Sequence, residues 1–100
     1  MPGLLNPMMY QTEELAAIWN QIQDKIPDYD GINEVQKLLL KSPLEDEDIL
    51  EITSILIFYQ IEKSLISKLF SLRKDVSPNY KLLINDVFDL LYINFDENLL

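Results

Sequence analysis

The chain contains neither cysteine nor histidine among its 100 residues. Without cysteine no disulfide can form, so a hydrophobic core alone must stabilise the fold. Because both residue types are absent, the chain cannot build a Cys/His zinc site, a Ser-His-Asp or Cys-His catalytic group, or the histidine-containing di-iron site of some helical bundles. A histidine phosphotransfer domain is excluded too, and no Asp-Ser-Leu is present to carry the prosthetic arm of an acyl carrier protein.

Glycine and basic residues are also scarce. The two glycines, Gly3 and Gly31, stand alone, so there is no glycine-rich phosphate-binding loop. No pair of carboxylates has the apolar setting that would suit acid/base catalysis, so we expect no enzymatic activity.

Eight basic against seventeen acidic residues give a net charge of -9, which should repel nucleic-acid phosphates and anionic membrane surfaces. We therefore predict no cofactor and no direct nucleic-acid binding.

Long apolar runs are missing as well. No uninterrupted one is longer than that of residues 55–59, which is far short of the roughly 18 residues that a membrane-spanning helix needs. Residues 1–10 contain neither the basic residues nor the apolar run of a secretory signal. Together with the missing cysteines, these features predict a cytoplasmic protein that neither crosses nor binds a membrane.

What the chain does contain is a helical pattern of apolar residues. Hydrophobic residues make up 48% of the chain, which is too much for a disordered protein. Helical spacing, caps and breaks predict four helices, whereas strand patterns are weak. The predicted helices cover residues 12–26, 31–41, 43–74 and 78–93. We predict an all-α fold, a compact antiparallel bundle with a long central third helix, forming a single domain over residues 12–100 behind an arm of residues 1–11.

Local patterns set the predicted boundaries. Thr12 suits an N-cap because acidic residues follow it in the first turn. Residues 28–31 are predicted to form a turn, and they lack the first and last acidic ligands of a calcium loop. Ser42, Pro43 and Glu45 match an N-cap, a first-turn proline and a capping-box glutamate, which predicts the start of the third helix.

The predicted third helix is apolar around most of its circumference. At roughly 100° per residue, two adjoining apolar arcs are separated by a line of charged residues. The first arc contains Leu50, Ile55, Ile57, Phe58, Ile61, Leu65, Leu69 and Leu72. The second contains Ile52, Leu56, Tyr59, Ile66 and Phe70, and the line between them contains Glu51, Glu62 and Arg73.

Two hypotheses explain this pattern. Either the other helices cover both arcs, or the second arc is left for a partner, with Glu62 at its border. The third helix would be roughly 40 Å long, against roughly 15 to 22 Å for the others, so no single short helix could cover it.

By elimination, we predict a small acidic protein-binding module that acts stoichiometrically as an inhibitor, immunity protein, adaptor or assembly factor. Its negative charge favours a partner with a basic surface. The candidate partner-binding residues are Tyr59, Glu62, Ile66 and Phe70, with Trp19, Glu45, Asp46, Glu47 and Asp48 as rim elements. In size and predicted helix count, the chain resembles the four-helix immunity proteins that protect bacteriocin producers, although no motif is shared.

Two other roles remain open. The second arc could pair with another copy of the chain in a homo-oligomeric structural subunit. Alternatively, the chain could be an acidic nucleic-acid mimic that occupies the basic groove of a DNA-binding protein, although its acids form only clusters at residues 24–30, 45–48 and 86–97. Consecutive acids such as 45–48 favour the helix dipole and solubility, so we predict no metal site.

Overall fold

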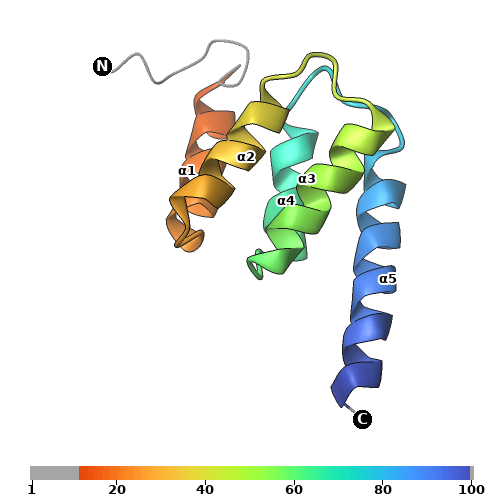
Figure 1. Cartoon of the computed structure of the whole chain (residues 1–100). Coiled ribbons are helices and arrows are strands. Elements are labelled where there is room, and N and C mark those ends of the chain that lie inside the picture. Colours follow the sequence, from red (N-terminus) through yellow and green to blue (C-terminus); the bar gives the residue numbers. More distant parts are fainter. Residues whose placement is uncertain (1–11, 100) are drawn as a thin grey trace.

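The computed structural model consists of helices whose directions alternate along the chain (Figure 1). It describes the backbone of residues 12–99 and the side chains of residues 12–91, so the predicted arm 1–11 lies outside the described residues. The five helices are α1 (Glu13–Lys25), α2 (Tyr29–Leu39), α3 (Asp46–Phe58), α4 (Lys63–Ser71) and α5 (Tyr80–Leu99). No strand occurs within residues 12–99, which confirms the all-α class. The predicted count of four helices is wrong by one, and the comparison with four-helix immunity proteins loses its basis.

The long third helix was predicted wrongly because the chain reverses between α3 and α4. Gln60 adopts a left-handed backbone, with a φ angle of 63°. Its N–H donates to the carbonyl of Ile57 at 2.8 Å, and the N–H of Ile61 donates to the carbonyl of Leu56 at 2.9 Å. These are the two hydrogen bonds of a Schellman motif, and the usual hydrophobic pair is supplied by the buried side chains of Leu56 and Ile61. The wheel drawn over residues 43–74 therefore joined two separate helices.

The starts of α1 and α2 both depend on capping side chains. The Thr12 hydroxyl accepts a hydrogen bond from a first-turn N–H at 3.1 Å, as predicted. Asp28 caps α2 by accepting a hydrogen bond from the N–H of Asp30 at 3.0 Å, so α2 begins earlier than predicted. Gly31, expected in a turn, therefore lies in the first turn of α2.

The starts of α3 and α5 were predicted too early because the segments that precede them pair with each other. Leu44 and Val76 form an isolated parallel β-bridge. The N–H of Leu44 donates to the carbonyl of Asp75 at 2.9 Å, and its carbonyl accepts from the N–H of Ser77 at 3.2 Å. Because this pairing requires extended backbone, the N-cap of α3 is Glu45 and not the predicted serine.

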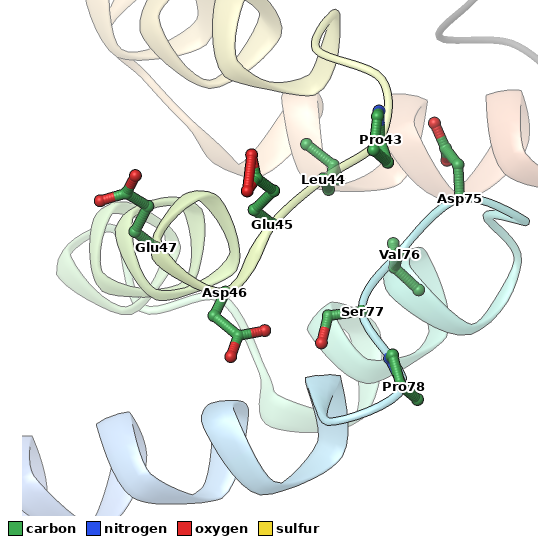
Figure 2. Close-up of a pocket in the computed structure, with 9 residues that line it drawn as sticks. All are labelled: Pro43, Leu44, Glu45, Asp46, Glu47, Asp75, Val76, Ser77 and Pro78. Atoms are coloured by element: carbon green, nitrogen blue, oxygen red, sulfur yellow. The ribbon is translucent and has the colours of Figure 1, made fainter.

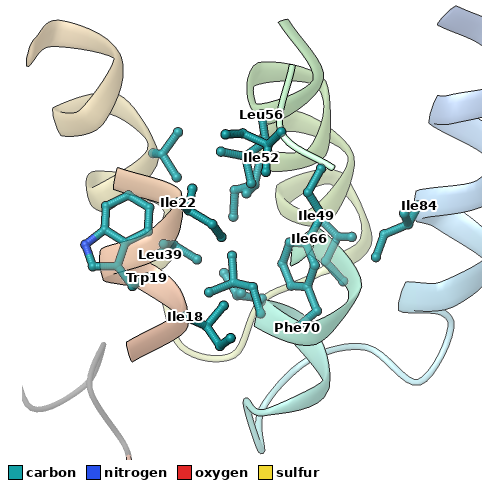
Figure 3. Packing of buried hydrophobic residues seen from close by; sticks show 14 of the residues in the cluster. Ile18, Trp19, Ile22, Leu39, Ile49, Ile52, Leu56, Ile66, Phe70 and Ile84 are labelled. Atoms are coloured by element: carbon teal, nitrogen blue, oxygen red, sulfur yellow. The ribbon is translucent and has the colours of Figure 1, made fainter. Parts of the chain in front are cut away.

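All five helices contribute to one hydrophobic core (Figure 3). α1 packs against α4, α2 packs against α3, and α5 packs against both α3 and α4. At about 1.5 Å per residue, the 20 residues of α5 span about 30 Å and the 13 residues of α3 about 20 Å. This difference in length explains why α5 extends past the ends of α3 and α4 in Figure 1. The largest fully buried side chains are Trp19, Phe70, Leu15, Ile22, Leu39, Leu44, Ile49, Ile52, Leu56, Ile66, Leu69 and Ile84.

Candidate protein-binding surface

Three of the residues predicted to bind a partner lie inside the bundle. Ile66 and Phe70 have no exposed surface, and Trp19 is 1% exposed. Figure 3 shows Ile66 and Phe70 among side chains of the neighbouring helices. A partner cannot reach these three residues in this structure. The inner sides of α3 and α4 carry the second arc of the sequence prediction, so the bundle itself covers most of that arc.

Tyr59 and Glu62 flank the reversal between α3 and α4. Tyr59 is half-buried, and its hydroxyl donates a hydrogen bond to the carboxylate of Asp28 at 2.9 Å. This hydrogen bond raises the pKa of Tyr59 above its ordinary value. Glu62 is exposed and is the N-cap of α4, without a side-chain hydrogen bond to that helix. Tyr59 therefore connects α3 to the start of α2, and only Glu62 faces solvent fully.

The acidic run at the start of α3 divides into one buried and three exposed side chains. Asp48 is buried and accepts hydrogen bonds from Lys41 Nζ at 2.8 Å and from the N–H of Glu45 at 3.0 Å. The hydrogen bond from Lys41 lowers the pKa of Asp48, and it outweighs the opposite effect of burial. Glu45, Asp46 and Glu47 are exposed. Asp48 is thus a structural residue and forms the capping box of α3 together with Glu45, while Asp46 and Glu47 make no contribution to this cap.

These three exposed acids line an open groove between the two Ser-Pro segments (Figure 2). The groove has a volume of about 680 Å³. Its lining residues are Pro43, Leu44, Glu45, Asp46, Glu47, Asp75, Val76, Ser77 and Pro78. Carboxylates are present on both walls, and no basic side chain lines either one. The exposed acids of one wall attract positive charge, but carboxylates alone do not select a particular ligand.

One wall of the groove is held in place by Arg73, which is 4% exposed. Its Nε and Nη2 donate to the two carboxylate oxygens of Asp75 at 2.9 and 2.8 Å. Its guanidinium also donates to the carbonyl oxygens of Leu39 and Lys41. Arg73 therefore joins the segment after α4 to the end of α2. Helical spacing places Arg73 only at the edge between two arcs, and no local pattern indicates this role.

Asp75 is fully engaged in this network. It accepts a hydrogen bond from the hydroxyl of Ser42 in addition to those from Arg73. Burial raises the pKa of Asp75, but the hydrogen bonds from Arg73 and Ser42, together with the charge of Arg73, outweigh burial and lower it. The carboxylate of Asp75 therefore serves the fold rather than an incoming ligand.

The structure also exposes large apolar side chains that the sequence analysis did not assign to a surface. Phe58, at the end of α3, is 79% exposed. Leu82 and Leu90 of α5 are 64% and 62% exposed. Helical spacing predicts Phe58 on an apolar arc of one continuous helix, and the reversal after α3 shows that this prediction is wrong.

The two leucines of α5 lie on one side of the helix. Residues four apart share a helix face, so Leu82, Asp86 and Leu90 form a single row, and Asp89 lies beside it. All four side chains are exposed. We refer to these four residues as the outer stripe of α5. The opposite side of the helix packs against the bundle, and Lys63 Nζ of α4 lies 5.6 Å from the ring centre of Phe88 there.

Charge is distributed unevenly over the helices. α3 contains Asp46, Glu47, Asp48 and Glu51 and no basic residue. The described side chains of α5 include Asp86, Asp89 and a single base, Lys81. In contrast, α4 contains Lys63 and Lys68 and no acid. The α3 and α5 side of the molecule is therefore negative, and α4 is positive.

Comparisons with known proteins give no match: no family model, no curated protein and no solved structure is similar to this chain. Within the described residues, no group of three or more acidic side chains is arranged to hold a metal ion. None of the helices described is both long and apolar enough to cross a membrane.

Proposed function

We propose that this protein is a stoichiometric protein-binding module, in the role of an inhibitor, immunity protein, adaptor or assembly factor. The observation that carries this proposal is the exposure of Phe58, Leu82 and Leu90 among the acidic residues of α3 and α5. Exposed apolar side chains supply the contact area on which most binding energy depends, and surrounding charges set the choice of partner. The negative charge speeds association with a basic surface.

The charge distribution favours a foreign partner over a second copy of the chain. A symmetric dimer through α5 would bring Asp86 and Asp89 close to the same residues of the other copy. Like charges opposite one another disfavour such an interface. Mimicry of nucleic acid is also less well supported, because leucines interrupt the acids on the exposed side of α5.

Affinity capture from the native host, with the full chain immobilised, tests this proposal. We expect one host protein to be retained in an equimolar amount and to remain bound at high salt, because apolar contacts are not screened. Light scattering of the purified chain at two concentrations should give the mass of a monomer. A stable dimer without a captured protein would contradict the proposal and support a structural subunit. A partner that is lost completely at high salt would instead support an acidic mimic.

A further inference from the structure

The outer stripe of α5 has the geometry of a helix-packing ridge. Leu82, Asp86 and Leu90 follow the four-residue spacing of the rows that pack into the groove of another helix. The two leucines lie about 12 Å apart along the helix at about 1.5 Å per residue. In Figure 1, α5 stands at the edge of the molecule, with α3 and α4 on one side of it. The stripe is therefore accessible along its length.

Both charged side chains of this stripe, Asp86 and Asp89, are acidic. Within the described residues, neither Asp86 nor Asp89 forms an ion pair. Lys81 is the sole base of α5, and its Nζ lies 6.0 Å from the ring centre of Tyr80. Helix α3, against which the other side of α5 packs, likewise carries exposed acids, Glu47 and Glu51, and no base. An occupant of the stripe must therefore bring positive charge together with apolar contact area.

We propose that the outer stripe of α5 binds a basic amphipathic helix of the partner protein. Apolar side chains of that helix pack against Leu82 and Leu90, and its lysines or arginines pair with Asp86 and Asp89. A helix presents side chains at the same spacing as the stripe, which allows ridge-to-groove packing, a common mode of peptide recognition. This inference rests on the proposed protein-binding function, and it names the surface and the chemistry of the partner.

Nuclear magnetic resonance with the full ¹⁵N-labelled chain tests the surface. The probe is a synthetic amphipathic helix of leucine and lysine, and its control is a peptide of the same composition whose scrambled order leaves no apolar face. We expect amide shifts to change mainly over residues 82–90, and hardly at all near Glu13 and Glu14, which are exposed acids on α1. The amphipathic peptide should bind at least about tenfold more tightly than the scrambled one. Equal binding of the two peptides would overturn the proposal, because charge attraction alone would then explain it.

Uncharged substitutions separate the stripe from other exposed apolar residues. The double variant Leu82→Ser/Leu90→Ser should bind the amphipathic peptide about tenfold or more weakly. Tyr29→Ser, at an exposed aromatic residue of α2, should leave the affinity unchanged and serves as the matched control. All three positions are well exposed, so the variants should fold, which helix content and thermal unfolding would verify. Unchanged affinity of the double variant would overturn the surface assignment.

Host capture distinguishes failure of this inference from failure of the proposed function. If the double variant retains the same host protein as the wild type does, the binding surface lies elsewhere and the protein-binding function stands. If the wild type retains no host protein, the function itself is contradicted, whatever the peptides do.

Discussion

A Cβ atom at Gly31 would lie 2.6 Å from Cζ of Tyr59 and would overlap its hydroxyl oxygen. The ring occupies this place because its hydroxyl donates a hydrogen bond to Asp28, the N-cap of α2, at 2.9 Å. The end of α3 and the start of α2 thus approach so closely that only a residue without a side chain fits between them. Gly31 is required here for packing, although its backbone is helical.

This relationship predicts that the effect of Gly31→Ala on the free energy of unfolding depends on the residue at position 59 and has opposite signs with tyrosine and with alanine there. In a Tyr59→Ala background, the substitution should raise the free energy of unfolding by up to about 1 kcal/mol, because alanine favours helix over glycine. With Tyr59 present, it should lower it by about 1 kcal/mol, because the ring is displaced and its hydrogen bond is lost. Urea unfolding of the four proteins in a double-mutant cycle measures this coupling. Equal effects in the two backgrounds would show that Gly31 and Tyr59 do not interact.

Gln60 provides a second prediction, since its φ angle of 63° suits glycine. Gln60→Gly should raise the free energy of unfolding by about 0.5 kcal/mol, because the left-handed region disfavours side chains. Gln60→Val should lower it by about 1 to 2 kcal/mol, since a branched side chain is strained there. Both are measured by urea unfolding. Similar effects of the two substitutions would mean that the reversal after α3 does not depend on this backbone conformation.

The same residue shows where prediction from the sequence stops. The all-α class and the start of α1 follow from helical spacing and from the Thr12 cap, which are local features. A glycine at position 60 would have indicated the end of α3, but glutamine does not. The start of α4 is equally hard to predict, because its N-cap Glu62 makes no side-chain capping hydrogen bond. The continuous apolar pattern therefore predicted one long helix.

The candidate surface was harder to predict for a related reason. A helical wheel assigns faces only while the helix continues. The wheel over one long helix placed Phe70 on the candidate binding arc and Phe58 on the other arc, yet Phe58 is 79% exposed and Phe70 is fully buried. Pairing of Leu44 with Val76 is likewise a long-range contact, which no local window of the sequence contains. The acidic character of the surface, in contrast, followed directly from composition.

Arg73 gives a third prediction through the groups that it binds. Arg73→Met would remove the guanidinium hydrogen bonds to the carboxylate of Asp75 and to two carbonyl oxygens, so we expect a loss of about 3 to 5 kcal/mol in the free energy of unfolding. Arg73→Lys keeps the charge but not the forked geometry and should lose part of this stability. Lys68→Met, at an exposed base of α4, is the matched control and should change stability by about 0.5 kcal/mol or less. A comparable loss in both methionine variants would contradict the anchoring role of Arg73.

Asp48 leads to a prediction about pH. Its pKa is lowered in the folded protein, chiefly by the hydrogen bond from Lys41, so the folded state holds the proton less tightly than the unfolded state does. This stabilisation is therefore present above the unfolded pKa of about 3.9 and is lost as the pH falls through the folded pKa. Urea unfolding from about pH 6 to pH 3 should show a smaller loss of stability for Asp48→Asn than for the wild type. Asp46→Asn, at an exposed position, should follow the wild type. Parallel curves for the wild type and Asp48→Asn would contradict the prediction.

Thr53 places a hydroxyl group where the described core offers it no partner. The side chain is fully buried in α3, and its Oγ1 has no hydrogen-bond partner within the described part of the chain. An unpaired buried hydroxyl costs about 1 to 3 kcal/mol, whereas valine has nearly the same shape without the polar group. Thr53→Val should therefore raise the free energy of unfolding by about 1 kcal/mol, since the two residues have similar helix propensities.

Thr53→Ser tests the contribution of the methyl group of this side chain separately from that of its hydroxyl group. It keeps the hydroxyl and removes the methyl group, so it should lower the free energy of unfolding by about 1 kcal/mol. Thermal and urea unfolding of the two variants and the wild type give the required order of stability, with valine highest and serine lowest. If valine instead ranked below threonine, the hydroxyl would be a net stabilising group of this core, and the unpaired assignment of Thr53 would be wrong.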